Sequence, residues 1–200
     1  KATEGVDLPA GSLVGQPWRL AFALQNDGWH LRSEIIWAKT SGKPEGNISG
    51  RPIRAHDTIF LLSKRESCFY DPVAVMEPCK TDPTKKKHAR SVWPIPIFSY
   101  RGGHPAPYPP DLARRMILLG TSAGGCCPTC GAPYRRADED AWEASCGCEA
   151  ADPVPCTVLD PFSGSGTTGS QALKYGLDYV GIDLNADYLP MARERIRTGK

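Results

Sequence analysis

The chain has 200 residues, of which 40% are hydrophobic, and its formal net charge is +2 at neutral pH. This length allows one domain, with or without a small insertion, and so mild a charge does not by itself indicate a protein that binds nucleic acid. The sequence contains neither an apolar run of about 18 residues, which a membrane-spanning helix needs, nor an N-terminal signal peptide. We therefore expect no membrane partner.

The first 71 residues predict one helix and three strands. The apolar spacing favours a helix from Leu13 to Asn26, and its regular part is expected to begin near Pro17. One strand is expected from His30 to Trp37, and a second from Asp57 to Ser63. Ser67 to Asp71 is expected to add a short edge or hairpin strand.

Residues 72–100 show no clear periodicity and contain the densest basic stretch of the chain. Lysine and arginine side chains neutralise phosphates, so this stretch is a candidate contact with double-stranded DNA. The residues expected to make that contact are Lys85, Lys86, Lys87 and Arg90, with Arg51, Arg54, Arg135 and Arg136 as weaker candidates. A solvated polar loop is the alternative interpretation of such a lysine run.

A helix expected from Pro110 to Leu119 is followed by a cysteine-rich segment. Five of the eight cysteines fall between residues 126 and 148, and two of them frame the tight turn Cys-Pro-Thr-Cys-Gly. Such spacing is typical of a tetrahedral zinc site. The expected ligands are Cys127, Cys130, Cys146 and Cys148, and either Cys126 or Cys156 could replace one of them. Disulfides and free thiols are the alternatives, but we favour a structural Zn²⁺ ion in a segment too small to bury a core of its own.

Residues 160–169 read Asp-Pro-Phe-Ser-Gly-Ser-Gly-Thr-Thr-Gly and follow the apolar run Thr-Val-Leu. This order predicts a strand that ends on a carboxylate, then a glycine turn, then the start of a helix. Gly164 and Gly166 would let the backbone turn sharply and approach a ligand, and Thr167 and Thr168 would cap the helix. A carboxylate at the end of such a strand can hold the ammonium group of a ligand.

A second strand from Tyr179 to Ile182 ends at Asp183, about 20 residues past the glycine turn, where an acidic residue usually binds the ribose hydroxyls of a nucleoside. A plain charge at a strand end is the alternative. Asn185 is expected to cap the next helix, Ala186 to about Arg197. The glycine turn also matches Gly-x-Gly-x-x-Gly, which raises the alternative of a dinucleotide-dependent oxidoreductase. A carboxylate facing a pyrophosphate, and only 31 residues after Gly169, argue against that alternative.

The string from Asp160 to Gly169 resembles the S-adenosylmethionine motif of the permuted, beta-class DNA amino-methyltransferases. Further blocks resemble the same family: LVGQPWR at 13–19, DGW at 27–29, IIWAK at 35–39, RP at 51–52, HDTIFL at 56–61, SVW at 91–93 and HPAPYP at 104–109. The resemblance implies an α/β, Rossmann-like methyltransferase fold with a mixed, mostly parallel sheet in circularly permuted order. It also implies methyl transfer from S-adenosylmethionine to the exocyclic amino group of adenine or cytosine in DNA. By the same resemblance we expect a cytoplasmic, nucleoid-associated protein of a bacterial or phage restriction–modification system, able to form a homodimer.

The resemblance also assigns parts of the chain to parts of a methyltransferase. Residues 1–71 would be the remainder of the catalytic half, 72–100 the segment that recognises the DNA target, and 101–125 with 151–200 the half that binds S-adenosylmethionine, interrupted by a zinc-binding insertion at 126–150. The residues implied to bind the cofactor are Asp160, Pro161, Phe162, Gly164, Gly166, Thr167, Thr168, Asp183, Asn185, His104 and Ala106. Pro105 and Pro107 stand where the usual pattern has Phe and Thr, which leaves the side-chain contacts of that block less defined.

The catalytic motif of that family, Asp/Asn/Ser-Pro-Pro-Tyr/Phe, does not occur in the sequence. Its polar side chain and proline carbonyl accept hydrogen bonds from the target amine, and its aromatic ring stacks on the flipped base. The only Pro-Pro pair, Pro109–Pro110, stands in the wrong order and in the wrong place. We therefore name no catalytic residue and expect this chain alone to be inactive. A non-catalytic DNA-binding module that retains the cofactor fold and the zinc knuckle is the alternative.

Overall fold

The computed structural model describes residues 8–9, 11–41, 50–98, 108–138, 141–149 and 152–199. The elements in the first half of this part of the chain are α1 (Gln16–Asn26), β1 (His30–Lys39), β2 (His56–Ser63), the 3-10 turn η1 (Val73–Val75), β3 (Glu77–Pro78), β4 (Lys86–Lys87) and β5 (Val92–Ile95). Those in the second half are α2 (Pro110–Gly120), β6 (Arg135–Arg136), β7 (Trp142–Glu143), β8 (Thr157–Asp160), α3 (Thr167–Lys174), β9 (Asp178–Gly181) and α4 (Tyr188–Thr198). None of these helices has the length and apolar character that crossing a membrane requires.

Strand β1 is the centre of a three-stranded sheet in the order β2-β1-β5. It pairs antiparallel with β2 and parallel with β5, so the sheet is mixed. Alternate side chains of a strand point to the same face, and Ile35 and Trp37 of β1 are buried, as are Trp93 and Ile95 of β5. The indole N–H of Trp37 donates a hydrogen bond to the Ile95 carbonyl at 2.8 Å, which ties the two strands together.

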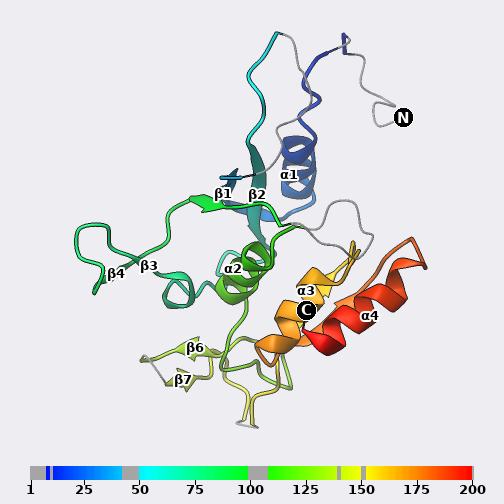
Figure 1. The fold of residues 1–200 in the computed structure, drawn as a ribbon. Coiled ribbons are helices and arrows are strands. Elements are labelled where there is room, and N and C mark those ends of the chain that lie inside the picture. The colour runs from blue at the N-terminus through cyan, green and yellow to red at the C-terminus, as the bar shows by residue number, and fades with distance from the viewer. Residues whose placement is uncertain are drawn as a thin grey trace.

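Helix α2 lies between the three-stranded sheet and the C-terminal helices (Figure 1). Leu119 packs into the core of the sheet, whereas Ile117 packs against Ala172 and Leu177 around α3. Residues two apart on an α-helix point in nearly opposite directions, because one turn takes about 3.6 residues. One helix can therefore belong to both hydrophobic cores.

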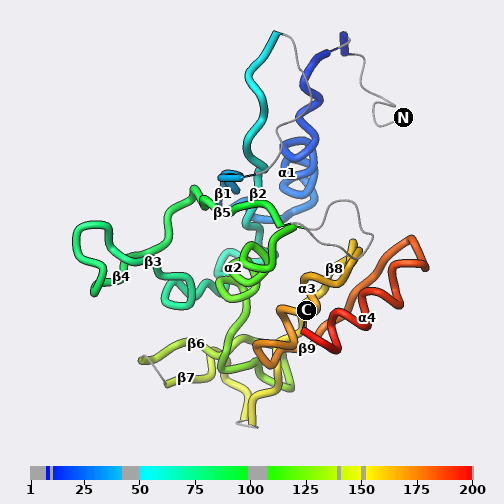
Figure 2. The backbone as a smooth tube through the Cα atoms, viewed as in Figure 1, coloured from blue at the N-terminus to red at the C-terminus, as the bar shows by residue number. Residues whose placement is uncertain are grey.

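The C-terminal unit is a parallel pair of strands, β8 and β9, which α3 connects and to which α4 is added through contacts with α3 (Figure 2). Gly169 permits close packing here, since a Cβ atom at that position would lie 2.5 Å from Cε1 of Tyr179 and 2.6 Å from Cδ1 of Ile196. Among the described residues, β8 pairs with β9 alone and β2 pairs with β1 alone. Each of these two strands therefore keeps one edge without a neighbouring strand, and Leu159 of β8 is 61% exposed.

Most of the predicted elements are present close to their expected bounds, and α1 begins one residue before Pro17. The strand expected at 67–71 is wrong, because this stretch pairs with no strand and its last residue, Asp71, is buried and accepts hydrogen bonds from turn amides. Strand β5 lies in the segment for which the sequence predicts no regular structure. It contains Pro94, which strands tolerate mainly at sheet edges, and β5 is an edge strand.

Candidate functional site

Asp160 ends β8 and faces the helix that follows it. Its Oδ1 accepts a hydrogen bond from the backbone N–H of Phe162 at 2.9 Å, and its Oδ2 accepts one from the hydroxyl of Thr168. The Thr168 hydroxyl is also hydrogen-bonded to the hydroxyl of Tyr108. The end of β8, the first turn of α3 and the approach to α2 therefore meet at one carboxylate.

Tyr108 is an uncharged hydrogen-bonding group at this meeting point. Burial raises the pKa of Tyr108 to about 12, the hydrogen bond with Thr168 opposes that rise, and the charge of Asp160 adds to it. The phenol therefore keeps its proton at neutral pH. It contributes a polar hydroxyl without placing a second negative charge beside Asp160.

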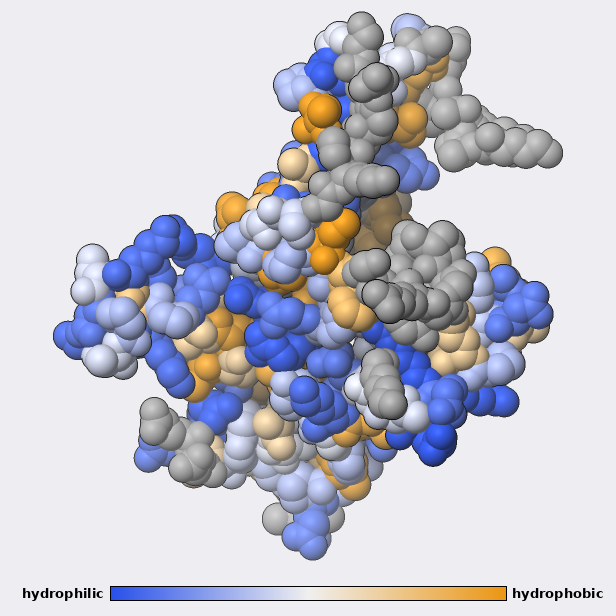
Figure 3. All heavy atoms as spheres, in the orientation of Figure 1, coloured by the Kyte–Doolittle hydropathy of each residue, from blue (hydrophilic) through white to orange (hydrophobic). Residues whose placement is uncertain are grey.

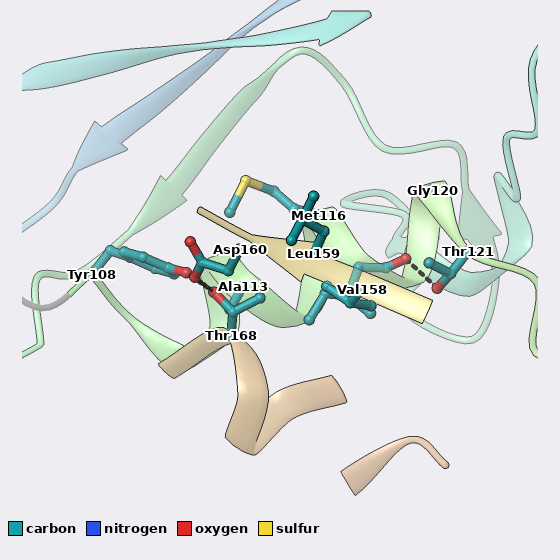
Figure 4. A pocket seen from close by; sticks show the side chains of 10 residues that line it. Tyr108, Ala113, Met116, Gly120, Thr121, Val158, Leu159, Asp160 and Thr168 are labelled. Carbon is teal, nitrogen blue, oxygen red and sulfur yellow. Dashed lines mark hydrogen bonds between the residues drawn. The ribbon is translucent and has the colours of Figure 1, made fainter. Parts of the chain in front are cut away.

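A groove of about 300 Å³ runs along β8 and reaches this cluster (Figure 4). Tyr108, Asp160 and Thr168 lie together at one end of the group of lining residues, and Thr121 lies at the other. The remaining lining residues are Ala113, Met116, Ile117, Gly120, Val158 and Leu159. An apolar groove with a few converging polar groups is the usual form of a small-molecule site.

The glycine turn after β8 has the sharp geometry that the sequence predicts. Gly164 and Gly166 both have positive φ, at 48° and 76°, which favours glycine. A Cβ atom on Gly166 would lie 3.0 Å from both Cα and the carbonyl oxygen of Ala192 in α4. The close approach at Gly166 is thus made to a neighbouring helix of the protein.

Asp183 joins the glycine turn to the loop after β9. Its Oδ2 accepts a hydrogen bond from the Gly164 N–H at 2.7 Å, and its Oδ1 accepts one from the Asn185 N–H at 2.9 Å. Asn185 does not cap α4 as expected, because the helix begins later, with Asp187 at its N-terminus; the Asn185 side chain instead accepts a hydrogen bond from the Asp187 N–H at 3.0 Å. Asp160 and Asp183 therefore stand at the carboxyl ends of two adjacent parallel strands.

Arg195 of α4, which was not among the predicted residues, is hydrogen-bonded to the glycine turn. Its guanidinium, only 4% exposed, donates hydrogen bonds to Oγ of Ser165 at 2.8 Å and to Oγ1 of Thr167 at 2.7 Å. The prediction that Thr167 and Thr168 cap α3 is wrong, because residues distant in sequence engage both hydroxyls and no side chain caps the helix. Arg195 could have been recognised from its place in the helix. It lies three residues after Ala192, on the inward face of α4, where the helical period predicts an apolar residue.

Four cysteine sulfurs come together in the segment before β8. The Sγ atoms of Cys127, Cys130, Cys146 and Cys148 all lie within 4.8 Å of one another. The backbone N–H groups of Cys130 and Thr129 lower the pKa of the Cys127 thiol to about 6. The two proposed substitutes point elsewhere, since Cys126 contacts the Pro155 carbonyl and Cys156 the Ser122 carbonyl.

The lysine run forms a short hairpin in which β4 pairs antiparallel with β3. Lys87 stands opposite Glu77, and Lys85, whose side chain is 78% exposed, forms an ion pair with Asp82 at 3.5 Å. The exposed basic residues between positions 77 and 90 are Lys80, Lys85, Lys86, His88 and Arg90, whereas Lys87 is half-buried. The hairpin extends away from α2 in Figure 1, and this part of the surface is largely hydrophilic in Figure 3.

Four other predicted residues are placed as follows. Arg136, a weaker candidate for DNA contact, instead forms an ion pair with the buried Asp71 at 2.8 Å. Phe162 is 82% exposed beside the turn. His104 and Ala106 lie outside the described residues.

Comparison with known proteins places this site in a family. The model of the N6/N4 DNA methylase family matches residues 6–128 and 149–194. The chain is 41% identical over 184 residues to the type II methyltransferase M.SmaI of Serratia marcescens, covering 92% of this chain and 52% of that protein. It is 36% identical over 195 residues to M.XycI of Xanthomonas campestris pv. cyanopsidis, covering 96% and 54%. The chain thus spans about half the length of the curated relatives it matches.

Solved structures show the same fold. The complex of M1.HpyAVI with S-adenosylmethionine matches with a TM-score of 0.56 and 19% identity, over 92% of this chain and 71% of that one. The cytosine-N4-specific PvuII DNA methyltransferase matches with a TM-score of 0.61 and 18% identity, over 98% and 67%. The α/β fold is therefore that of the S-adenosylmethionine-dependent DNA methyltransferases, as predicted. The chain belongs to the N6/N4 DNA methylase family.

Proposed function

We propose that this chain binds S-adenosylmethionine as the methyl donor of a DNA methyltransferase that acts on the exocyclic amino group of adenine or cytosine at specific sites in double-stranded DNA. The observation that carries the proposal is the pair of carboxylates, Asp160 and Asp183, which flank a glycine turn at the ends of adjacent parallel strands. Ligands of open α/β sheets bind at that edge. Membership of the N6/N4 DNA methylase family supports the same function, and the two relatives named above are bacterial type II methyltransferases.

The side chains present fit this cofactor. Asp160 lies beside the hydroxyls of Thr168 and Tyr108 at one end of the groove, where a carboxylate can accept charge-assisted hydrogen bonds from an ammonium group. A carboxylate oxygen can accept two hydrogen bonds, so Asp183 can bind ribose hydroxyls in addition to the amides of Gly164 and Asn185. When bound, S-adenosylmethionine supplies an electrophilic methyl group.

These contacts assign a different role to each group of residues. Thr168 and the Phe162 amide hold the Asp160 carboxylate in place, and Arg195 fixes the hydroxyls of the turn. The exposed lysines of the β3–β4 hairpin would neutralise DNA phosphates. The sequence has no Asp/Asn/Ser-Pro-Pro-Tyr/Phe motif, so no residue of this chain is proposed to bind the target amine.

Calorimetry on the purified protein tests the cofactor assignment. We expect binding of S-adenosylmethionine and not of NAD. Asp160→Asn and Asp183→Asn should each weaken that binding about 10- to 100-fold, because a hydrogen bond to a charged group contributes about 1.5–3 kcal/mol. Asp178→Asn is the matched control, since Asp178 is an exposed residue at the opposite end of β9. Binding of NAD instead, or an equal loss in the Asp178 variant, would contradict the proposal.

A methyl-transfer assay tests the expected division of activity. With tritiated S-adenosylmethionine and double-stranded DNA, we expect the chain alone to bind the cofactor but to transfer no label, since the family's catalytic motif is missing from its sequence. Label in the DNA would refute that expectation. Binding of DNA without any binding of S-adenosylmethionine would favour the alternative of a non-catalytic DNA-binding module. Homodimer formation stays a prediction.

A further inference from the structure

Most of the cysteine cluster lies in a segment that the family model does not match. The family match leaves out residues 129–148, which contain three of the four clustered cysteines. Within the segment, β6 and β7 form a small hairpin, and Cys126 bridges to Pro133 and Val154 on either side. The proposed function assigns no role to this segment.

The four sulfurs have the arrangement of a closed metal site. A zinc ion bound at about 2.3 Å by four thiolates separates its sulfurs by about 3.8 Å, which agrees with sulfurs that all lie within 4.8 Å of one another. The turn that carries the first pair is tight, since the Gly131 N–H donates to the Cys127 carbonyl and the Cys127 N–H donates to the Ala132 carbonyl, both at 2.8 Å. With four protein ligands, the site leaves no open coordination position, which is characteristic of structural zinc.

The segment has no apolar core of its own. Of the described residues from 126 to 149, Cys127 alone is buried. A segment without an apolar core needs a crosslink such as a metal ion to adopt one structure. None of the eight cysteines is in a disulfide, so disulfides do not provide that crosslink.

One side chain of the segment reaches into the rest of the protein. Arg136 of β6 forms its ion pair with Asp71, which is only 3% exposed, and its guanidinium stacks on the ring of Trp142 from β7 at 4.4 Å. A buried carboxylate is unfavourable without such a partner. The cysteine-rich segment therefore supplies the compensating charge for a residue outside itself.

Asp71 in turn organises the start of the segment that carries the lysine hairpin. Its Oδ1 accepts hydrogen bonds from the N–H groups of Val73 at 3.0 Å and Ala74 at 3.3 Å, which begin η1. Its own N–H donates to the Leu119 carbonyl at the end of α2 at 3.0 Å. If Arg136 moved away, Asp71 would lose its ion-pair partner. The hydrogen bonds that Asp71 accepts at the start of residues 72–98 would then be weakened.

We propose that Cys127, Cys130, Cys146 and Cys148 bind a structural zinc ion, and that the ion holds the β6–β7 hairpin so that Arg136 neutralises Asp71 and fixes the start of the basic segment at residues 72–98. The zinc ion thus stabilises the contact between the cysteine-rich segment and the part of the chain proposed to contact DNA. It takes no part in binding S-adenosylmethionine, so the inference does not depend on the proposed function.

Elemental analysis of the purified protein tests the metal. We expect one zinc ion per chain in the unaltered protein and in Cys68→Ser, because Cys68 lies outside the cluster. Cys130→Ser and Cys148→Ser should lose most of the zinc. Cobalt substitution should give the intense thiolate-to-cobalt absorption of a tetrahedral site. Protein that contains no zinc, or equal loss of metal in Cys68→Ser, would overturn the site.

Hydrogen exchange tests whether zinc stabilises this contact. Removal of the zinc by a chelator should speed exchange of the Val73 and Ala74 amides as well as that of residues 126–149, and should leave β8 and α3 unchanged. Arg136→Met should speed exchange at Val73 and Ala74 while it retains the zinc. Arg135→Met, a change in the exposed neighbour on the same strand, is the control and should alter neither. Faster exchange confined to residues 126–149 after zinc removal, or unchanged exchange at Val73 and Ala74 in Arg136→Met, would refute this stabilisation.

Discussion

Gly166→Ala is the sharpest test of how the cofactor turn is built. The added Cβ atom meets Cα and the carbonyl oxygen of Ala192 at 3.0 Å, and these are backbone atoms of a helix that cannot move aside alone. Such overpacking costs about 1–3 kcal/mol, and a positive φ of 76° adds about 1–2 kcal/mol for any residue with a Cβ atom. Reduced freedom of the unfolded chain returns about 0.4–1 kcal/mol. We expect a net loss of about 2–4 kcal/mol in the free energy of unfolding.

Gly176→Ala is the matched control at the other end of α3. Gly176 also has a positive φ, at 71°, but a Cβ atom there would meet no atom of the described residues within 4 Å. The backbone strain and the unfolded-state effect are therefore common to both variants, and the difference between them isolates the packing against Ala192. Urea unfolding followed by circular dichroism gives both free energies if the dependence on urea is unchanged.

The binding of S-adenosylmethionine supplies a second measurement. Gly166→Ala should weaken it, because the turn would shift away from α4 and take Gly164 and Asp183 with it, whereas Gly176→Ala should leave it unchanged. If Gly166→Ala destabilises the protein no more than Gly176→Ala does, the reasoning about Ala192 is wrong.

Three further predictions concern other parts of the site. Arg195→Met should lower the free energy of unfolding by about 2–4 kcal/mol, since each lost hydrogen bond to the charged guanidinium contributes about 1.5–3 kcal/mol and relief of a buried charge offsets part of the loss; Arg193→Met, on the exposed face of the same helix, should change it little in the same urea assay. The pKa of Tyr108 is raised from 10 to about 12 in the folded protein, so its contribution to stability is complete below pH 10 and is lost, by about 3 kcal/mol, as the pH rises to 12. Tyr108→Phe should therefore flatten the dependence of the free energy of unfolding on pH between 10 and 12. An unchanged dependence on pH in that variant would contradict this origin. Replacing Lys85, Lys86 and Lys87 together by Ala should weaken DNA binding on every sequence and reduce the salt slope by about 3 in a filter-binding titration, whereas Lys174→Ala should not; equal salt slopes would favour a merely solvated hairpin.

The sequence was most informative where local chemistry decides the structure. Apolar periodicity located α1, β1, β2 and α2, and the glycine turn located β8, α3 and β9, since a positive φ at Gly164 and Gly166 is a local requirement. Strand β5 was missed for an equally local reason, because Pro94 argues against a strand unless the pairing partner on one side is known. Membership of the sheet comes from β1, more than 50 residues earlier in the chain.

Side-chain roles were harder to predict, because long-range partners decide them. Threonine at the start of a helix is typical of a cap. However, the hydroxyls of Thr167 and Thr168 are hydrogen-bonded to Arg195 and Tyr108, which lie 28 and 60 residues away in the sequence. An arginine beside another arginine is typical of a phosphate contact, but Arg136 forms an ion pair with Asp71, which lies 65 residues earlier in the chain. Nothing in the neighbouring sequence distinguishes these arrangements from the expected ones.

The half-paired strand β8 has a practical consequence for handling the protein. Within the described part of the chain, one edge of β8 has no neighbouring strand. This edge offers backbone N–H and C=O groups in a row, with Leu159 exposed among them, and such an edge is a template for the strands of other molecules. A net charge of +2 gives little repulsion between copies. We expect turbidity and light scattering to rise with concentration during purification. A polypeptide that pairs with the β8 edge should reduce the scattering, whereas a clear solution of the chain alone at high concentration would contradict this expectation.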